Sequence, residues 1–87
     1  MPHKFDLPDD WEEEGWKCKV FEKEEREEPH VTFIHGTDRW RYSLMMGDLM
    51  DRRPPPDKLP RALFEWARQN RQILVDAWNR KYPKNRV

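Results

Sequence analysis

The amino-acid sequence predicts an α+β domain in which a small antiparallel three-stranded sheet packs against one long C-terminal helix, in the order β-β-β-α. Three observations lead to this prediction. Short segments in the first half alternate apolar and polar residues, a glycine-containing turn separates two of them, and an amphipathic helical pattern fills residues 60–82. With 87 residues the chain has room for one hydrophobic core.

Residues 1–14 are predicted to be an acidic, loosely ordered arm, and residues 15–87 a single α+β domain. The arm contains Pro2 and Pro8 among many acids and lacks the periodicity of a helix or a strand. We expect Trp11 to attach this arm to the body of the domain.

Three segments have the pattern of strands. In residues 16–20 three apolar residues share one face and two lysines share the other. Residues 30–35 and 39–44 are predicted to form a hairpin, because the residues between them, which begin at Gly36, are of the types that favour tight turns. The proline-rich residues 46–60 that follow predict an extended crossover.

The C-terminal segment is predicted to form one helix, from about Pro60 to Tyr82. Its apolar residues recur at helical spacing and form a wide stripe that should face the sheet. The stripe contains Leu59, Ala62, Leu63, Trp66, Ala67, Ile73, Leu74, Ala77 and Trp78. Asn70 lies near the centre of this stripe, where an unpaired amide costs about 1–3 kcal/mol, so we expect a hydrogen bond from Asn70 to a strand.

The composition predicts a cytoplasmic protein that is not inserted in a membrane. The first residues lack the apolar run of a signal peptide, and no segment approaches the roughly twenty apolar residues of a membrane span. Cys18 is the only cysteine, which excludes an intrachain disulfide and favours a buried structural thiol.

The two signs of charge are segregated although the net charge is zero. Residues 1–29 contain eleven acids and five bases, a sum of minus six, and the remaining residues sum to plus six. Two interpretations stay open: the basic part binds a partner, or the acidic arm neutralises the basic helix within the molecule.

No metal site or cofactor is expected. His30 and His35 are five residues apart on a predicted strand, so they point to opposite faces and cannot readily share an ion. His3 and Cys18 are the only other histidine or cysteine ligands. The sequence also lacks a phosphate-binding glycine loop, a nucleophile elbow and a zinc-protease helix, so a non-enzymatic protein is favoured over an enzyme.

A second strip on the C-terminal helix predicts a protein interface. It combines arginines with aromatic residues, the types that dominate interface energetics. The strip consists of Phe64, Arg68, Arg71, Val75 and Tyr82. The leading hypothesis is therefore a small interaction domain that binds a protein partner or a second copy of itself.

Nucleic-acid binding is the alternative function. Cations that hold phosphates are available on the third strand and on the helix, at Arg39, Arg41, Arg61, Arg80 and Lys81. Trp40 and Tyr42 alternate with the strand arginines and should face the opposite side, toward the core. An RNA-cleaving toxin that uses His30 or His35 for proton transfer belongs to this alternative.

Two stretches, EEPHVTFIHG and RALFEWARQNRQILVDAWNRKY, resemble the family of small bacterial proteins catalogued as domain of unknown function 4160. The likeness covers residues 26–82. The matched positions are His30, Asn70, Arg71, Trp78 and Asn79. Where the family commonly has a second histidine, this chain has Thr32. The resemblance implies one member of a toxin–antitoxin-like pair, and thus a protein partner.

Overall fold

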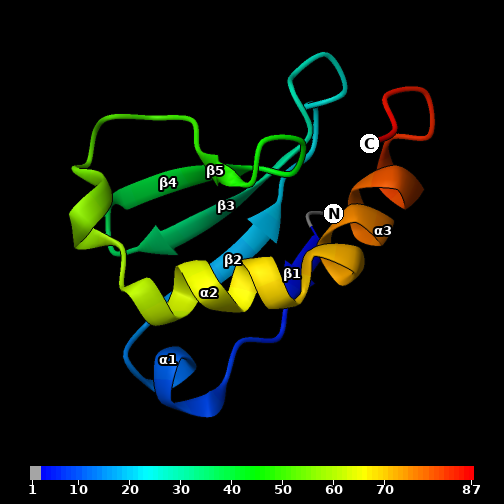
Figure 1. Ribbon diagram of the computed structural model, residues 1–87. Coiled ribbons are helices and arrows are strands. Elements are labelled where there is room, and N and C mark those ends of the chain that lie inside the picture. The colour runs from blue at the N-terminus through cyan, green and yellow to red at the C-terminus, as the bar shows by residue number, and fades with distance from the viewer. Residues whose placement is uncertain (1–2) are drawn as a thin grey trace.

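A five-stranded antiparallel sheet forms one layer of the structure, a computed structural model that describes residues 3–87 (Figure 1). Neighbours in the sheet are also neighbours in the chain, in the order β1-β2-β3-β4-β5. The strands are β1 (His3–Phe5), β2 (Trp16–Val20), β3 (His30–His35), β4 (Asp38–Ser43) and β5 (Asp48–Leu49). The sheet is therefore a meander, in which each strand returns beside the one before it.

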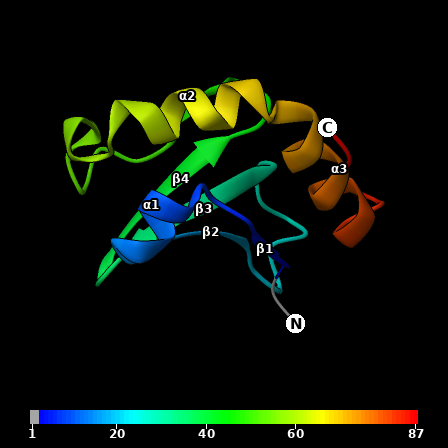
Figure 2. The ribbon, with the colours of Figure 1, turned by 90° about the horizontal axis from the view of Figure 1, so that it is seen from below.

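Two helices form the second layer: α2 (Arg61–Gln69) lies across one face of the sheet, and α3 (Arg71–Lys81) lies beside the end of the strands (Figure 2). Phe33 of β3 meets Trp66 edge-on at 6.3 Å between ring centroids, and Tyr42 of β4 meets Phe64 at 5.5 Å. A short helix, α1 (Asp9–Glu13), connects β1 to β2. The hydrophobic core thus lies between the sheet and the two C-terminal helices.

The prediction of a three-stranded sheet is wrong, because two short edge strands extend it. The segment predicted to be a loosely ordered arm contains β1 and α1. Phe5 and Leu7 in that segment are only 4% and 5% exposed. Burial of these two side chains attaches the N-terminal segment to the core, and β1 pairs with β2.

The prediction of one long helix is also wrong, because the chain breaks at Asn70 into α2 and α3. Asn70 has φ −106° and ψ 20°, and its side-chain amide donates to the carbonyl of Trp66 at 2.8 Å. Asparagine is unfavourable in helix interiors because its side chain competes for the hydrogen bonds of nearby backbone groups. The amide therefore bonds within its own helix rather than to a strand.

The break changes which residues of α3 face the core. A continuous helix would place Ile73 in the apolar stripe and Val75 beside it. In the structure Ile73 is 59% exposed, whereas Val75 is 6% exposed. The inner side of α3 is formed by Leu74, Val75, Ala77 and Trp78.

The central strands agree with the sequence pattern. Residues 16–20 form β2, and β3 pairs with β4 through a two-residue turn between His35 and Asp38. Gly36 occupies the first turn position with φ +61°, a conformation that glycine adopts without steric cost. Cys18 is fully buried, as predicted for a structural thiol, and this burial raises the pKa of the thiol. Within residues 3–87 no helix has the length and apolar character needed to cross a membrane.

Candidate functional site

The face of the sheet opposite the helices is basic. Direct cross-strand partners lie on the same side of a sheet, so the register defines two rows on this face. One row runs from β1 to β4 through Lys4, Lys19, Thr32 and Arg41. The other runs from β2 to β4 through Lys17, Ile34 and Arg39. We call the five basic members of these rows, Lys4, Lys17, Lys19, Arg39 and Arg41, the cationic face.

Four of these five cations have no carboxylate partner in the described part of the chain. Lys4, Lys17, Lys19 and Arg39 take part in none of the ion pairs found among residues 3–87. The guanidinium of Arg39 lies 5.3 Å from the centroid of the Phe21 ring. Lys4 and Lys19 stand directly opposite each other, an arrangement that costs stability when no anion lies near.

Arg41, the fifth member, is bound within the molecule. Its Nε and Nη2 donate to the two carboxylate oxygens of Asp51 at 2.9 and 2.7 Å. A longer contact of 3.4 Å joins Nη1 to Glu27. The two hydrogen bonds from Arg41 hold the pKa of Asp51 below its usual range. The positive charge available to a ligand therefore comes from the other four residues.

Two open hollows meet at Arg39. The larger, of about 670 Å³, is lined by Thr37, Asp38, Arg39, Arg53, Pro54, Pro55 and Lys58. The smaller, of about 250 Å³, is lined by Phe21, Glu24, Thr32, Arg39, Arg41 and Asp51. Arg53 and Lys58 thus add two further bases beside the cationic face, and an aromatic ring lies in the adjoining hollow.

The connection between β2 and β3, residues 21–29, is here called the acidic loop. It is attached to the C-terminal part of the chain by Tyr82, whose hydroxyl donates to the carbonyl of Phe21 and accepts from the amide of Glu24 at 3.1 Å. The side chain of Asn85 donates to the carbonyls of Glu25 and Glu27 at 3.0 and 2.7 Å. Burial of Tyr82 raises the pKa of its phenol.

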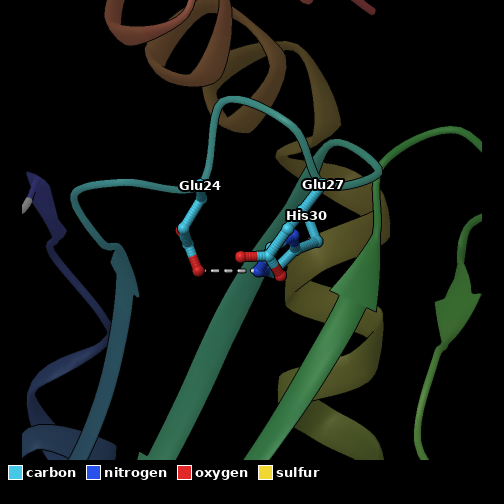
Figure 3. A group of neighbouring side chains, drawn as sticks. All are labelled: Glu24, Glu27 and His30. Carbon is cyan, nitrogen blue, oxygen red and sulfur yellow. Dashed lines mark hydrogen bonds and ion pairs between the residues drawn. The ribbon is translucent and has the colours of Figure 1, made fainter.

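Three side chains of the acidic loop and its boundary with β3 converge: Glu24, Glu27 and His30 (Figure 3). One ligand atom of each lies within 4.8 Å of the others. His30 is fully buried, and its Nε2 lies 3.0 Å from a carboxylate oxygen of Glu24. Such a group of two carboxylates and one imidazole has the donor atoms of a metal site.

The five residues of the predicted protein interface lie in two environments. Val75 and Tyr82 are buried, at 6% and 7% exposure. Phe64 is half-buried against Tyr42, and Arg71 donates from Nε to the carbonyl of Leu44 at 3.1 Å. Arg68 is exposed, and its Nη1 lies 3.8 Å from a carboxylate oxygen of Glu65. The outer part of the strip is therefore Phe64, Arg68 and Arg71.

The predicted nucleic-acid residues are divided between the two layers. Arg39 and Arg41 lie on the cationic face, with Trp40 and Tyr42 on the core side as the alternation predicts. The remaining three belong to the helices: Arg61 begins α2, and Arg80 and Lys81 end α3. Figure 2 shows α2 over the other face of the sheet and α3 beside the end of the strands.

Each family-matched position has a structural contact. The rings of His30 and Trp78 lie 5.5 Å apart, and Asn70 forms the break between the helices. Arg71 bonds to the turn after β4, and Asn79 accepts from the backbone amide of Val87 at 2.8 Å. Among these positions the structure brings His30 and Trp78, which are distant in the sequence, into contact.

Sequence reasoning missed the three lysines of the cationic face and the two glutamates beside His30. The lysines gather only through the pairing of β1 with β2 and of β2 with β3, which no local pattern specifies. The glutamates did leave a signal, since Glu24, Glu27 and His30 are spaced at intervals of three. Histidine and cysteine ligands alone do not reveal that spacing, because two of the three residues are glutamates.

Comparison with known proteins gives no relative: no protein-family model, no curated protein and no solved structure matches this chain.

Proposed function

We propose that this protein binds single-stranded nucleic acid on the cationic face of its sheet. The observation that carries the proposal is the set of four outward-facing cations, Lys4, Lys17, Lys19 and Arg39, that lack a carboxylate partner within residues 3–87. Phosphates bind such groups by releasing condensed counterions, a term that does not depend on sequence.

The shape of the face favours a single strand over a duplex. An open sheet with basic residues and a ring accommodates unstacked bases, whereas duplex DNA is usually entered by a protruding helix or ribbon. Phe21 supplies the ring, and Arg39 lies over it at 5.3 Å. A backbone lying on the cationic face would pass both hollows that Arg39 lines.

Binding of a fluorescein-labelled 12-nucleotide RNA, measured by fluorescence anisotropy, tests this proposal. We expect binding at low salt. The logarithm of the association constant should fall linearly with the logarithm of the salt concentration, with a slope of about −0.7 for each phosphate contact. The double variant Lys17→Gln/Arg39→Gln should bind about tenfold more weakly and reduce the slope by about 1.4.

The matched control is Arg61→Gln/Arg80→Gln, which removes two exposed arginines from the helical layer. It should leave both the affinity and the salt slope unchanged. Equal losses in the two double variants, or no RNA binding at low salt, would contradict the proposal. A circular dichroism spectrum of each variant checks that the fold is retained.

A second candidate, a protein-docking surface, is favoured by a different observation. Met45 and Met46 are 64% and 76% exposed in the turn between β4 and β5. Arg71 donates to the carbonyl of Leu44 in that turn. Gly47 of the same turn lies close to Tyr42, since a Cβ atom at Gly47 would lie 3.6 Å from the Tyr42 hydroxyl. The ring of Tyr42 in turn packs on Phe64. The methionines therefore lie beside the exposed part of the predicted interface strip.

The occupant that fits this surface is a protein segment with an apolar residue flanked by acids, because methionines adapt to irregular apolar surfaces and Arg68 and Arg71 are cationic. The resemblance to family 4160 implies a protein partner, without specifying the chemistry of its binding segment.

We expect Met45→Ser/Met46→Ser to abolish co-purification of a partner that the unmodified protein retains. Ile73→Ser, which changes an equally exposed apolar residue on α3, should not affect the partner. Retention of that same partner by the methionine variant would overturn this second candidate.

A further inference from the structure

His30 has a hydrogen-bonding arrangement that fixes which ring nitrogen carries hydrogen. Its Nδ1 lies 2.7 Å from the carbonyl oxygen of Glu28. A carbonyl oxygen can only accept, so Nδ1 is the donor of this bond. In the neutral ring the other nitrogen, Nε2, presents its lone pair toward a carboxylate oxygen of Glu24, 3.0 Å away.

Two acceptor atoms at this distance, beside a fully buried ring, need a cation between them. A proton on Nε2 is one such cation, and a metal ion is the other. The bond from Nδ1–H to a backbone carbonyl is the arrangement by which metal-binding histidines are held in place and made more basic.

The distances suit a metal ion. Two atoms bound to one Zn²⁺ at about 2.1 Å lie about 3.0–3.4 Å apart for bond angles between 90° and 109°. The separation of His30 Nε2 and the Glu24 oxygen, 3.0 Å, lies at the edge of that range. The carboxylate of Glu27 lies within 4.8 Å of both ligand atoms, and its side chain is 43% exposed, so it can rotate toward them (Figure 3).

The charge around His30 also favours a divalent cation. Glu24, Glu27 and Asp51 contribute three negative charges, and Arg41 and Arg39 contribute two positive charges, which sum to minus one when the imidazole is neutral. Arg41 neutralises only part of this charge, because both oxygens of Asp51 bind it more closely than Glu27 does.

The glutamates are positioned by bonds that leave ligand atoms available. The second oxygen of Glu24 accepts from the backbone amide of Phe21 at 2.9 Å. Asn85 and Tyr82 hold the backbone of the acidic loop. The acidic loop is thereby ordered before any ion arrives, which reduces the entropic cost of forming a site.

We propose that Glu24, Glu27 and His30 form a three-ligand site for a divalent transition-metal ion. An imidazole nitrogen combined with carboxylate oxygens suits Zn²⁺, and three protein ligands leave one coordination position open to water or to a further ligand. The site goes beyond the proposed nucleic-acid function and does not depend on it.

Calorimetric titration of the chelator-treated full chain with Zn²⁺ tests the site. We expect one ion per chain and a rise in Tm of about 4 °C or more when Zn²⁺ is in large excess over its Kd. Glu27→Gln should weaken Zn²⁺ binding by about tenfold or more, since it removes a charged ligand. Glu25→Gln, an exposed residue in the same loop, should bind Zn²⁺ as the unmodified protein does.

Histidines elsewhere on the surface are the competing explanation for any binding. His3→Gln and His35→Gln should leave the affinity unchanged, whereas His30→Gln should abolish binding. Because His30 is buried and its loss can unfold the chain, Glu27→Gln carries the test independently. Absence of Zn²⁺ binding, equal affinity of Glu27→Gln and Glu25→Gln, or loss of binding in His3→Gln or His35→Gln would overturn the proposal.

Discussion

Replacement of Trp78 by alanine is expected to lower the free energy of unfolding by about 3–5 kcal/mol. Trp78 is fully buried, and its ring lies 5.5 Å from His30 and 4.5 Å from Tyr82 between centroids. Its indole nitrogen also donates to the carbonyl of Asn85 at 2.7 Å. The substitution removes these contacts together, leaves a cavity and leaves that carbonyl without its partner. Small domains are stabilised by only about 5–15 kcal/mol, so this loss is a large fraction of the total stability.

Urea denaturation measures this loss, and Ile73→Ala on the same helix is the control. Because Ile73 is 59% exposed, its truncation should change stability by no more than about 0.5 kcal/mol. The contrast is informative, since helical periodicity alone places both residues on the apolar stripe. A cost for Ile73→Ala equal to that for Trp78→Ala would mean that the helix is continuous through Asn70.

The second large effect is expected from Tyr82→Phe, at about 1–3 kcal/mol. The phenol hydroxyl serves two backbone groups at once, the carbonyl of Phe21 and the amide of Glu24. Phenylalanine keeps the ring packing on Trp78 but leaves both backbone groups of the acidic loop without this partner. Amide hydrogen exchange should therefore increase in residues 21–29 more than in the central strands.

The effect of Tyr82→Phe should also depend on pH. Burial raises the pKa of the Tyr82 phenol above its unfolded value of about 10. The stabilisation from the neutral phenol is then fully present below pH 10 and is lost as pH rises through the folded pKa. The difference in unfolding free energy between the unmodified protein and Tyr82→Phe should shrink above about pH 10. A difference independent of pH from 7 to 11 would contradict this reasoning.

These contacts link the fold to both proposed binding functions. The acidic loop is held by Tyr82 and Asn85 at one end of the molecule, and it places Glu24 in the same hollow as Arg39 and Arg41. The separation of charge in space differs from the segregation along the sequence, because Lys4, Lys17 and Lys19 belong to the acidic residues 1–29. Cations gather on the open face of the sheet, and carboxylates gather where that face meets the acidic loop.

Part of the candidate site follows from strand alternation alone. Alternation placed Arg39 and Arg41 on one side of their strand and Trp40 and Tyr42 on the other, and the structure confirms it. Alternation gives the side of each residue but not its neighbours. Arg39 stands opposite Ile34 across the local hairpin, but Lys17 and Lys19 reach β3, and Lys4 reaches Lys19, only through long-range pairing, which assembles the cationic face.

The sequence by itself determined the α+β class, the strand at residues 16–20, the hairpin around Gly36 and the buried Cys18, because each has a local pattern of its own. The tertiary structure alone decided the rest. Strands of three and two residues, such as β1 and β5, are too short to show periodicity and exist only through pairing with a neighbour.

The break at Asn70 has the same kind of cause. Helical periodicity continues through residues 60–82, so the pattern contains no stop signal at this position. The structure ends α2 there because the Asn70 side chain bonds to the Trp66 carbonyl and because the rotated α3 buries Val75 and Trp78 against the end of the sheet. The local preference of asparagine and the packing of distant segments together selected the two-helix arrangement.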